Sequence, residues 1–267
     1  MTALAYTLTD SKTMLRRNLR RLQRYPSLTL MLVGMPILFL LLFVYVFGGQ
    51  LSHGLGSGLA GGHSGRAGYL NYVVPGILLM TVAAAVQGTA IVVAMDMTTG
   101  ITDRFRTMAI ARSAVLAGHV LSSVIQTLAS LAIVLGVAIA LGFRPTADPS
   151  HWLAAIGVLL LFTLALIWLA TALGLAAKSV ETASNTPMFL TLLPFLGSAF
   201  VPASTMPAGL EQFAEAQPFT PVTETVRGLL TGTSIGTNAV AAIAWSVGIA
   251  VAAYLWAIRL YTHRQPR

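Results

Sequence analysis

Six long runs without any Asp, Glu, Lys or Arg constrain this chain more than any other feature of its sequence. A helix needs about 20 apolar residues to cross a membrane, because each residue advances about 1.5 Å through a hydrocarbon layer of about 30 Å. Only helices or a closed barrel satisfy the backbone at that depth. Because the apolar residues are continuous rather than alternating, we expect an all-α integral membrane protein with six transmembrane helices. The predicted spans are 28–47, 70–95, 115–141, 152–177, 185–201 and 239–258.

The composition agrees with a membrane protein. Of the 267 residues, 56% are hydrophobic and only 9% are charged, whereas about a quarter of the residues of a soluble domain are charged. The chain has no cysteine, which excludes disulfides and thiolate metal sites. The net charge of +8 would suggest a nucleic-acid partner for a soluble protein. Here membrane topology explains that charge, and no nucleic-acid partner is expected.

The positions of the basic residues predict the orientation of the spans. Six spans place both termini on one side, and that side holds 13 of the 16 Lys and Arg residues. Basic residues accumulate on the cytoplasmic side of membrane proteins, so both termini are predicted to be cytoplasmic. The inner set is Lys12, Arg16, Arg17, Arg20, Arg21, Arg24, Arg104, Arg106, Arg112, Lys178, Arg259, Arg264 and Arg267; the outer set is Arg66, Arg144 and Arg227.

The segment 11–25 before the first span is predicted to be an amphipathic helix at the membrane surface. Met14 or Leu15, Leu19 and Leu22 recur at helical spacing. The remaining positions place a basic face near anionic lipid headgroups. A plain basic flank is the alternative. The predicted interfacial residues are Arg16, Arg17, Arg20, Arg21 and Arg24.

Two segments on the predicted outer side differ in character. The segment 48–68 is rich in glycine and is predicted to be a flexible linker. The segment 202–238, between the fifth and sixth spans, is amphiphilic, and short helices broken by Pro218 and Pro221 are expected there. Irregular backbone inside a membrane is tolerated only where protein or water covers it.

The sequence contains no motif for catalysis or nucleotide binding in the structural context that such a motif requires. A GxGxxG match at 56–61 lies in the glycine-rich segment and not in the strand–turn–helix unit that binds dinucleotides. The only lysines are Lys12 and Lys178, and neither lies in a Walker A sequence. We therefore predict that this chain is not an enzyme, binds no ATP by itself and holds no metal.

The polar residues inside the spans are few. All eight Asp and Glu residues lie outside the middle of the predicted spans, which argues against a proton-driven pump, because such pumps relay protons through buried carboxylates or histidines. His119 is interpreted as a packed polar residue. Gln87, Asn185 and Ser198 are the candidates for contact with a cargo; hydrogen bonding between helices is the alternative use of these residues.

The sequence DRFRTMAIAR at 103–112 is a basic and half-apolar segment between the second and third spans. Its arginines can pair with acidic groups of a cytoplasmic partner, and its apolar side chains can fill a groove. Anchoring of the loop on the inner side is the alternative role for the arginines. The residues that would carry partner contact are Asp103, Arg104, Phe105, Arg106, Met108, Ile110 and Arg112.

Four segments in this order resemble the membrane subunits of type-two ABC exporters, especially the bacterial daunorubicin-resistance permease group. They are the basic segment before the first span, YLNYVVPGILLM at 69–80, the segment 103–112, and QPFTPVTETVRGLLTG at 217–232. Gln217 stands where such relatives often have Asn, and the first outer loop is unusually rich in glycine.

The resemblance implies an ATP-driven exporter of an amphipathic drug, antibiotic or lipid in the bacterial plasma membrane. Two six-span subunits, identical or homologous, would pair above two ATPase subunits that bind ATP and Mg²⁺. The segment 103–112 would be a short coupling helix that docks on the ATPase, and the cargo would pass near the first, second and fifth spans. A proton-driven multidrug antiporter and a non-transporting membrane scaffold remain the alternatives.

Overall fold

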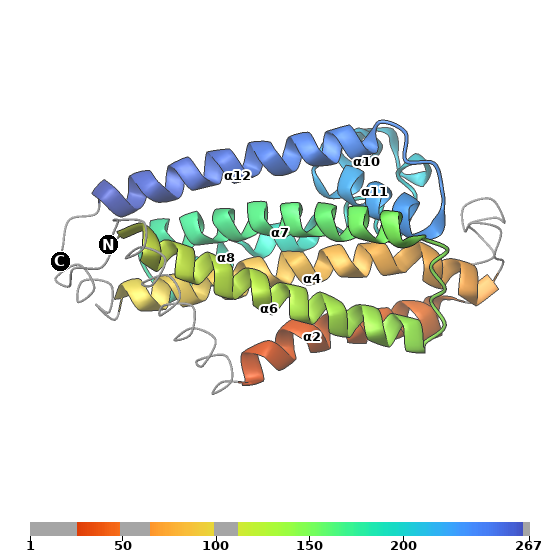
Figure 1. Cartoon of the computed structure of the whole chain (residues 1–267), viewed down its shortest axis with the longest axis horizontal. Helices are drawn as coiled ribbons and strands as arrows, with labels where there is room; N and C mark the ends of the chain where they lie inside the picture. The colour runs from red at the N-terminus through yellow and green to blue at the C-terminus, as the bar shows by residue number, and fades with distance from the viewer. Residues whose placement is uncertain (1–25, 49–64, 99–111, 264–267) are drawn as a thin grey trace.

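The computed structural model describes residues 26–48, 65–98 and 112–263, and every regular element among them is helical (Figure 1). The all-α expectation is thereby confirmed for this part of the chain. The elements are α2 (Pro26–Leu41), the π-helical η1 (Leu42–Phe47), α4 (Gly65–Thr98), α6 (Arg112–Ala140), α7 (Pro149–Ala176), α8 (Val180–Asn185), α9 (Met188–Leu192), the 3₁₀ turn η2 (Ala203–Thr205), α10 (Ala208–Ala216), α11 (Phe219–Thr231) and α12 (Asn238–His263).

Four of the six predicted spans are helices long and apolar enough to cross a membrane. They are 67–98 in α4, 116–140 in α6, 149–176 in α7 and 238–262 in α12. The first predicted span, 28–47, is α2 continued by η1, and its apolar part, Leu32–Phe47, is shorter. Pro36 lies inside α2 and lacks the backbone N–H that a regular helix would use.

The fifth predicted span, 185–201, is not one helix in the structure. α8 ends at Asn185, α9 covers only Met188–Leu192, and turns follow over 193–200. Pro187 and Pro194 explain this result, because neither residue can donate a helical hydrogen bond and each disfavours helix at the residue before it. A count of six complete spans therefore stays a prediction.

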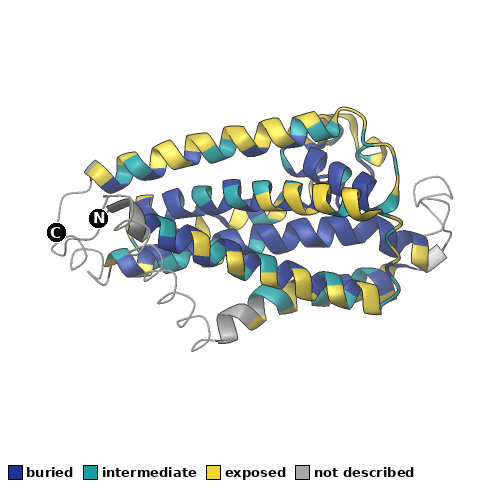
Figure 2. Cartoon of the chain, viewed as in Figure 1, coloured by how far each residue is buried: buried dark blue, intermediate teal, exposed yellow. Residues whose placement is uncertain are grey.

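α4 is the central helix of the bundle. It packs against α7, α6, α2, α8 and α11, and 72% of the residues in its most apolar stretch are buried. α12 instead packs along α7 and presents apolar residues outward, with Val240 73% exposed (Figure 2). An outward apolar face of this kind suits hydrocarbon rather than water as the surrounding medium.

The basic residues that lie within the described part of the chain agree with the two sides predicted from the sequence. At one end, Val93 of α4, Leu116 of α6, Leu175 of α7 and Tyr261 of α12 form an apolar cluster, and Lys178 lies two residues after the end of α7. At the opposite end the backbone N–H of Thr146 donates to the carbonyl of Leu230 in α11. This arrangement agrees with the predicted alternation of the helices.

The segment 202–238 contains two short helices, α10 and α11. α10 ends at Ala216, Pro218 immediately precedes α11, and Pro221 lies in the first turn of α11 rather than between helices. Only Pro218 therefore separates two helices. A proline is tolerated in a first turn because the N–H groups there have no intrahelical partner. α11 ends at Gly232, whose φ of 72° suits the left-handed conformation that glycine adopts.

Asp148 caps the N-terminus of α7 and gives a test of this helix boundary. The backbone N–H of His151 donates to its carboxylate at 2.9 Å, as does the Ser150 hydroxyl at 2.8 Å. Chiefly through the His151 backbone bond, the pKa of Asp148 is lowered from 3.8 to about 2. A lowered pKa in the folded state stabilises the fold above the unfolded value, and this stability is lost as the pH falls towards 2.

We therefore expect the native chain to unfold at a higher temperature than Asp148→Ala at neutral pH. This difference in unfolding temperature should disappear as the pH falls from about 4 to about 2. Thermal unfolding in detergent across this pH range measures the effect. A gap that stays constant down to pH 2 would show that the carboxylate does not act as a charged cap.

Candidate functional site

The residues predicted to dock on an ATPase lie almost entirely outside the described residues. Segment 99–111 is not described, and it contains Asp103, Arg104, Phe105, Arg106, Met108 and Ile110. Arg112 is the first residue of α6. The arginines of the predicted interfacial helix, from Arg16 to Arg24, also precede the first described residue, Pro26. The roles of these two groups stay predictions.

The three residues predicted to meet the cargo do not form one site. The Gln87 side-chain amide donates to the carbonyl of Ser184 at 3.0 Å, and the next residue, Asn185, is exposed at the end of α8. Ser198 lies in the turns after α9, and its carbonyl accepts from the hydroxyl of Tyr72 in α4 at 3.0 Å. Tyr72 and Gln87 are separated by about 22 Å along the helix axis, so the Gln87 region and the Ser198 region are distinct.

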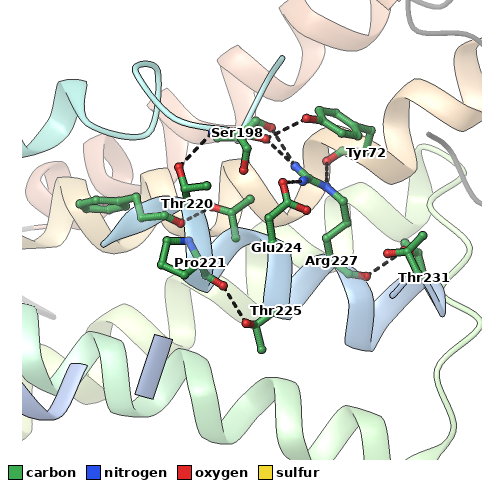
Figure 3. A network of polar contacts seen from close by, with 12 residues as sticks. Tyr72, Ser198, Thr220, Pro221, Glu224, Thr225, Arg227 and Thr231 are labelled. Carbon is green, nitrogen blue, oxygen red and sulfur yellow. Dashed lines mark hydrogen bonds and ion pairs between the residues drawn. The ribbon is translucent and has the colours of Figure 1, made fainter. Parts of the chain in front are cut away.

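A buried arginine organises the Ser198 region. Arg227 of α11 is only 3% exposed, and its guanidinium donates to four groups (Figure 3). Nε donates to the Tyr72 carbonyl at 3.1 Å, Nη2 donates to the carbonyls of Ser198 at 2.8 Å and Ala199 at 3.5 Å, and Nη1 pairs with the Glu224 carboxylate. One side chain thus joins α4, α11 and the turns that follow α9.

The geometry requires an arginine rather than a lysine. The guanidinium carbon lies 3.8 Å from the centre of the Tyr72 ring, where a planar cation is attracted to the face of the aromatic ring. At the same time its N–H groups reach acceptors in three directions, which a flexible ammonium cannot do from one position. Burial of this charge is compensated by the Glu224 carboxylate and by backbone carbonyls.

Two of the carbonyls that Arg227 binds, those of Ser198 and Ala199, are available because the chain is not helical there. Segment 193–200 consists of turns, so its polar backbone groups need partners outside the segment. The Ser198 N–H donates to the Thr220 hydroxyl at 3.3 Å, while the Ser198 carbonyl accepts from Tyr72 and Arg227. α4 and α11 therefore supply the hydrogen bonds that a continuous fifth helix would have made internally.

Gln217 extends these contacts to the start of the turns. Its side-chain amide donates to the Leu193 carbonyl at 3.1 Å and to the Thr220 hydroxyl at 3.3 Å. The side-chain oxygen Oε1 of Gln217 accepts from the Phe219 N–H at 3.3 Å. A Cβ at Gly197 would lie 2.2 Å from the side-chain nitrogen of Gln217, so any larger residue there would displace this amide. We call these residues the arginine cluster: Tyr72, Ser198, Gln217, Thr220, Glu224 and Arg227.

Aromatic rings fasten the same turns to the first helix. Phe43 of η1 stacks on Phe200 with ring centres 4.4 Å apart, and Phe39 of α2 meets Phe195 edge-on at 5.5 Å. Phe195 and Phe200 stack on each other at 4.9 Å. The first helix therefore packs against the turns that the arginine cluster joins to α4, and these are the regions of the predicted first, second and fifth spans.

A second buried polar contact lies near the other end of α4. Nε2 of His119 is 3.3 Å from Oδ2 of Asp96, and both side chains are 4% exposed. The sequence places Asp96 at the edge of an apolar run, and nothing in its local spacing points to His119. The structure therefore buries a carboxylate that sequence inspection placed only outside the middle of the spans.

Sequence reasoning assigned Arg227 to the outer basic flank, but a signal for its pairing was present. Glu224 and Arg227 are three residues apart, which puts them on one face of a helix.

Within the described residues, no group of three or more His, Asp or Glu side chains is arranged to hold a metal ion. The arginine cluster holds backbone segments in position.

The chain is similar to known permease proteins over most of its length. A match to the ABC-2 type transporter family covers residues 9–231. The daunorubicin resistance ABC transporter permease protein DrrB1 of Streptomyces coeruleorubidus is 30% identical over 234 residues, which is 87% of this chain and 77% of that protein. The probable doxorubicin resistance ABC transporter permease protein DrrC of Mycobacterium tuberculosis is 24% identical over 251 residues, 90% of this chain and 84% of that protein.

Proposed function

Because the chain belongs to the ABC-2 type transporter family, we propose that it is the transmembrane subunit of an ATP-driven exporter of amphipathic small molecules. It is a multi-pass membrane protein with several apolar helices. The observation that carries the proposal is the family match over residues 9–231 together with the permease relative that is 30% identical. The names of the relatives favour a drug or antibiotic as the cargo.

Energy would enter through a partner. The sequence contains no Walker A motif, so we propose that a separate ABC ATPase pair binds ATP and Mg²⁺ on the cytoplasmic side of the bacterial plasma membrane. Segment 103–112 would be the coupling helix. The contact residues would be Asp103, Arg104, Phe105, Arg106, Met108, Ile110 and Arg112.

A second permease subunit, identical or homologous, would complete the path for the cargo. The apolar residues exposed along the first helix and after α8 agree with such a path or with lipid; Tyr45 is 57% and Phe189 57% exposed. In this arrangement the arginine cluster is a rigid support. It holds the broken fifth segment against α4, so that movement of α4 carries the turns after α9 with it.

Reconstitution tests the proposed function. The chain should co-purify with a cognate ABC ATPase, and vesicles containing both should move a fluorescent amphipathic drug such as daunorubicin only when ATP and Mg²⁺ are supplied. A vesicle preparation that moves no drug, with the ATPase bound and hydrolysing ATP, would favour the non-transporting scaffold.

The coupling helix gives a sharper prediction. Reversing Arg104 and Arg106 to Glu together should weaken co-purification of the ATPase about tenfold, because two attractive charge contacts become repulsive ones. The matched control is the reversal of Arg264 and Arg267 to Glu, which changes the same charge on the same predicted side. Equal binding of both variants to the ATPase would assign Arg104 and Arg106 to anchoring of the loop only.

The buried contact between Asp96 and His119 is the observation that favours the second candidate, a proton-driven antiporter, because such pumps relay protons through buried carboxylates and histidines. In that case transport would stop when the proton gradient is dissipated at constant ATP. Transport that persists without the gradient and stops when ATP is removed would exclude the antiporter.

A further inference from the structure

The contact between Asp96 and His119 joins two helices close to where the segment 99–111 enters and leaves the bundle. α4 ends at Thr98 and α6 begins at Arg112. Asp96 lies about 3 Å along the axis from the described end of α4, and His119 lies about 10 Å from the start of α6. The contact is thus a cross-link between the two helices that carry this segment.

The side chains around the contact between Asp96 and His119 are largely apolar, so breaking the contact would destabilise the fold. Val93 lies three residues before Asp96, and Leu116 lies three residues before His119, so each shares a helix face with the polar residue. Both belong to the apolar cluster formed with Ala172, Leu175, Ala257 and Tyr261 of α7 and α12. In an apolar and buried setting, a carboxylate or imidazole that loses its partner is costly.

We propose that Asp96 and His119 form a clamp that makes the adjoining ends of α4 and α6 move as one body. A displacement of segment 99–111 then shifts both helices together instead of spreading them apart. α4 also bears the carbonyl of Tyr72 that Arg227 binds, so the displacement reaches the arginine cluster through a continuous helix. The use of this clamp in coupling rests on the proposed function; its mechanical role does not.

The mechanical role is tested without ATPase or cargo. The chain has no cysteine, so Thr98→Cys on α4 and Leu121→Cys on α6 place two spin labels at exposed positions. Double electron–electron resonance in lipid nanodiscs should give one narrow distance distribution for the otherwise native chain. Asp96→Leu combined with His119→Leu should shift or broaden it, because this change removes the polar link, whereas replacement of a buried charged pair by apolar residues is often neutral for folding. An unchanged distribution in the double leucine variant would overturn the clamp.

The coupling role is tested in the complex with the ATPase. The same double leucine variant should bind the ATPase and hydrolyse ATP like the native chain, but transport about tenfold less drug per ATP hydrolysed. The control is Thr127→Val, which removes a buried hydroxyl of α6 bonded only within its own helix and should keep the native ratio. A native transport-to-ATP ratio in the double leucine variant would overturn this role.

The two proposals fail in different ways. If the native chain binds no ATPase or moves no drug with ATP, the proposed function is wrong, and the spin-label distances still decide whether the clamp exists. If the native complex transports and the double leucine variant transports equally well per ATP, the exporter stands and the clamp has no part in its coupling.

Discussion

Arg227→Ala is expected to lower the free energy of unfolding by about 3–5 kcal/mol, the cost of removing one partner from a buried ion pair. The substitution leaves the Glu224 carboxylate without its cation. It also removes the Arg227 donor from the carbonyls of Ser198 and Ala199, so the Ser198 carbonyl keeps only its bond from the Tyr72 hydroxyl. The turns after α9 would lose their attachment to α4, and we expect the variant to lose its fold at physiological temperature.

Thermal unfolding in detergent, followed by intrinsic fluorescence, measures this loss. Arg259→Ala is the matched control, because it removes an arginine that is exposed on α12 and should change the unfolding temperature little. Arg227→Lys should fall between the two, since it keeps the charge and loses the fork of donors. Equal unfolding temperatures for Arg227→Ala and Arg259→Ala would show that the arginine cluster does not hold the bundle together.

Gly76→Ala is the second substitution with a large expected effect. A Cβ at Gly76 of α4 would lie 2.5 Å from the carbonyl oxygen of Ala199 and 2.7 Å from its Cβ. Most of these close atoms are backbone, so α4 and the turn at Ala199 must separate. Overpacking of this kind costs about 1–3 kcal/mol, occasionally more, and here it exceeds the gain in helix propensity of about 1 kcal/mol.

Gly88→Ala on the same helix is the control for this prediction. Nothing lies within 4 Å of a Cβ added at Gly88, so this variant should gain stability from helix propensity alone. The measurement is the difference in unfolding temperature between the two alanine variants. A Gly76→Ala protein as stable as Gly88→Ala would mean that α4 does not pack tightly on the turn.

These two predictions concern one structural unit, and their effects should not add. Ala199 contacts Gly76 with its backbone and offers its carbonyl to Arg227. A turn already displaced by one substitution has less to lose from the other, so the double variant should be more stable than the sum of the single effects implies.

The long apolar runs predict α4, α6, α7 and α12 well, because a membrane span is decided by composition over about 20 residues. The same rule predicts a helix over 185–201, whereas the structure has only the short α9 and turns there. Pro187 and Pro194 mark where the helix breaks, but an apolar run indicates only burial. The path of the backbone at Ser198 depends on Thr220 and Arg227, which lie 22 and 29 residues later in the sequence. Non-local hydrogen bonds of this kind leave no periodic pattern to read.

The candidate site was predictable only in part for the same reason. The distribution of basic residues predicts the side of the membrane on which Arg227 lies. It carries no information on burial, so it does not distinguish the buried Arg227 from an exposed arginine. The pairing of Asp96 with His119 joins two different helices, and local spacing does not reveal it. Ser198 is a candidate for contact with a cargo because its side chain is polar. In the structure it is the backbone of Ser198 that bonds Tyr72, Thr220 and Arg227.

The dependence of the broken segment on α11 has a consequence for biosynthesis. Ser198 leaves the ribosome 29 residues before Arg227, a delay of about 1.5–6 s at ordinary rates of synthesis. During that interval the carbonyls of Ser198 and Ala199 lack their bonds from Arg227, and a backbone group without its full set of partners is costly inside a bilayer. A nascent chain truncated before Arg227 is therefore expected to expose this segment to membrane chaperones and quality-control proteases.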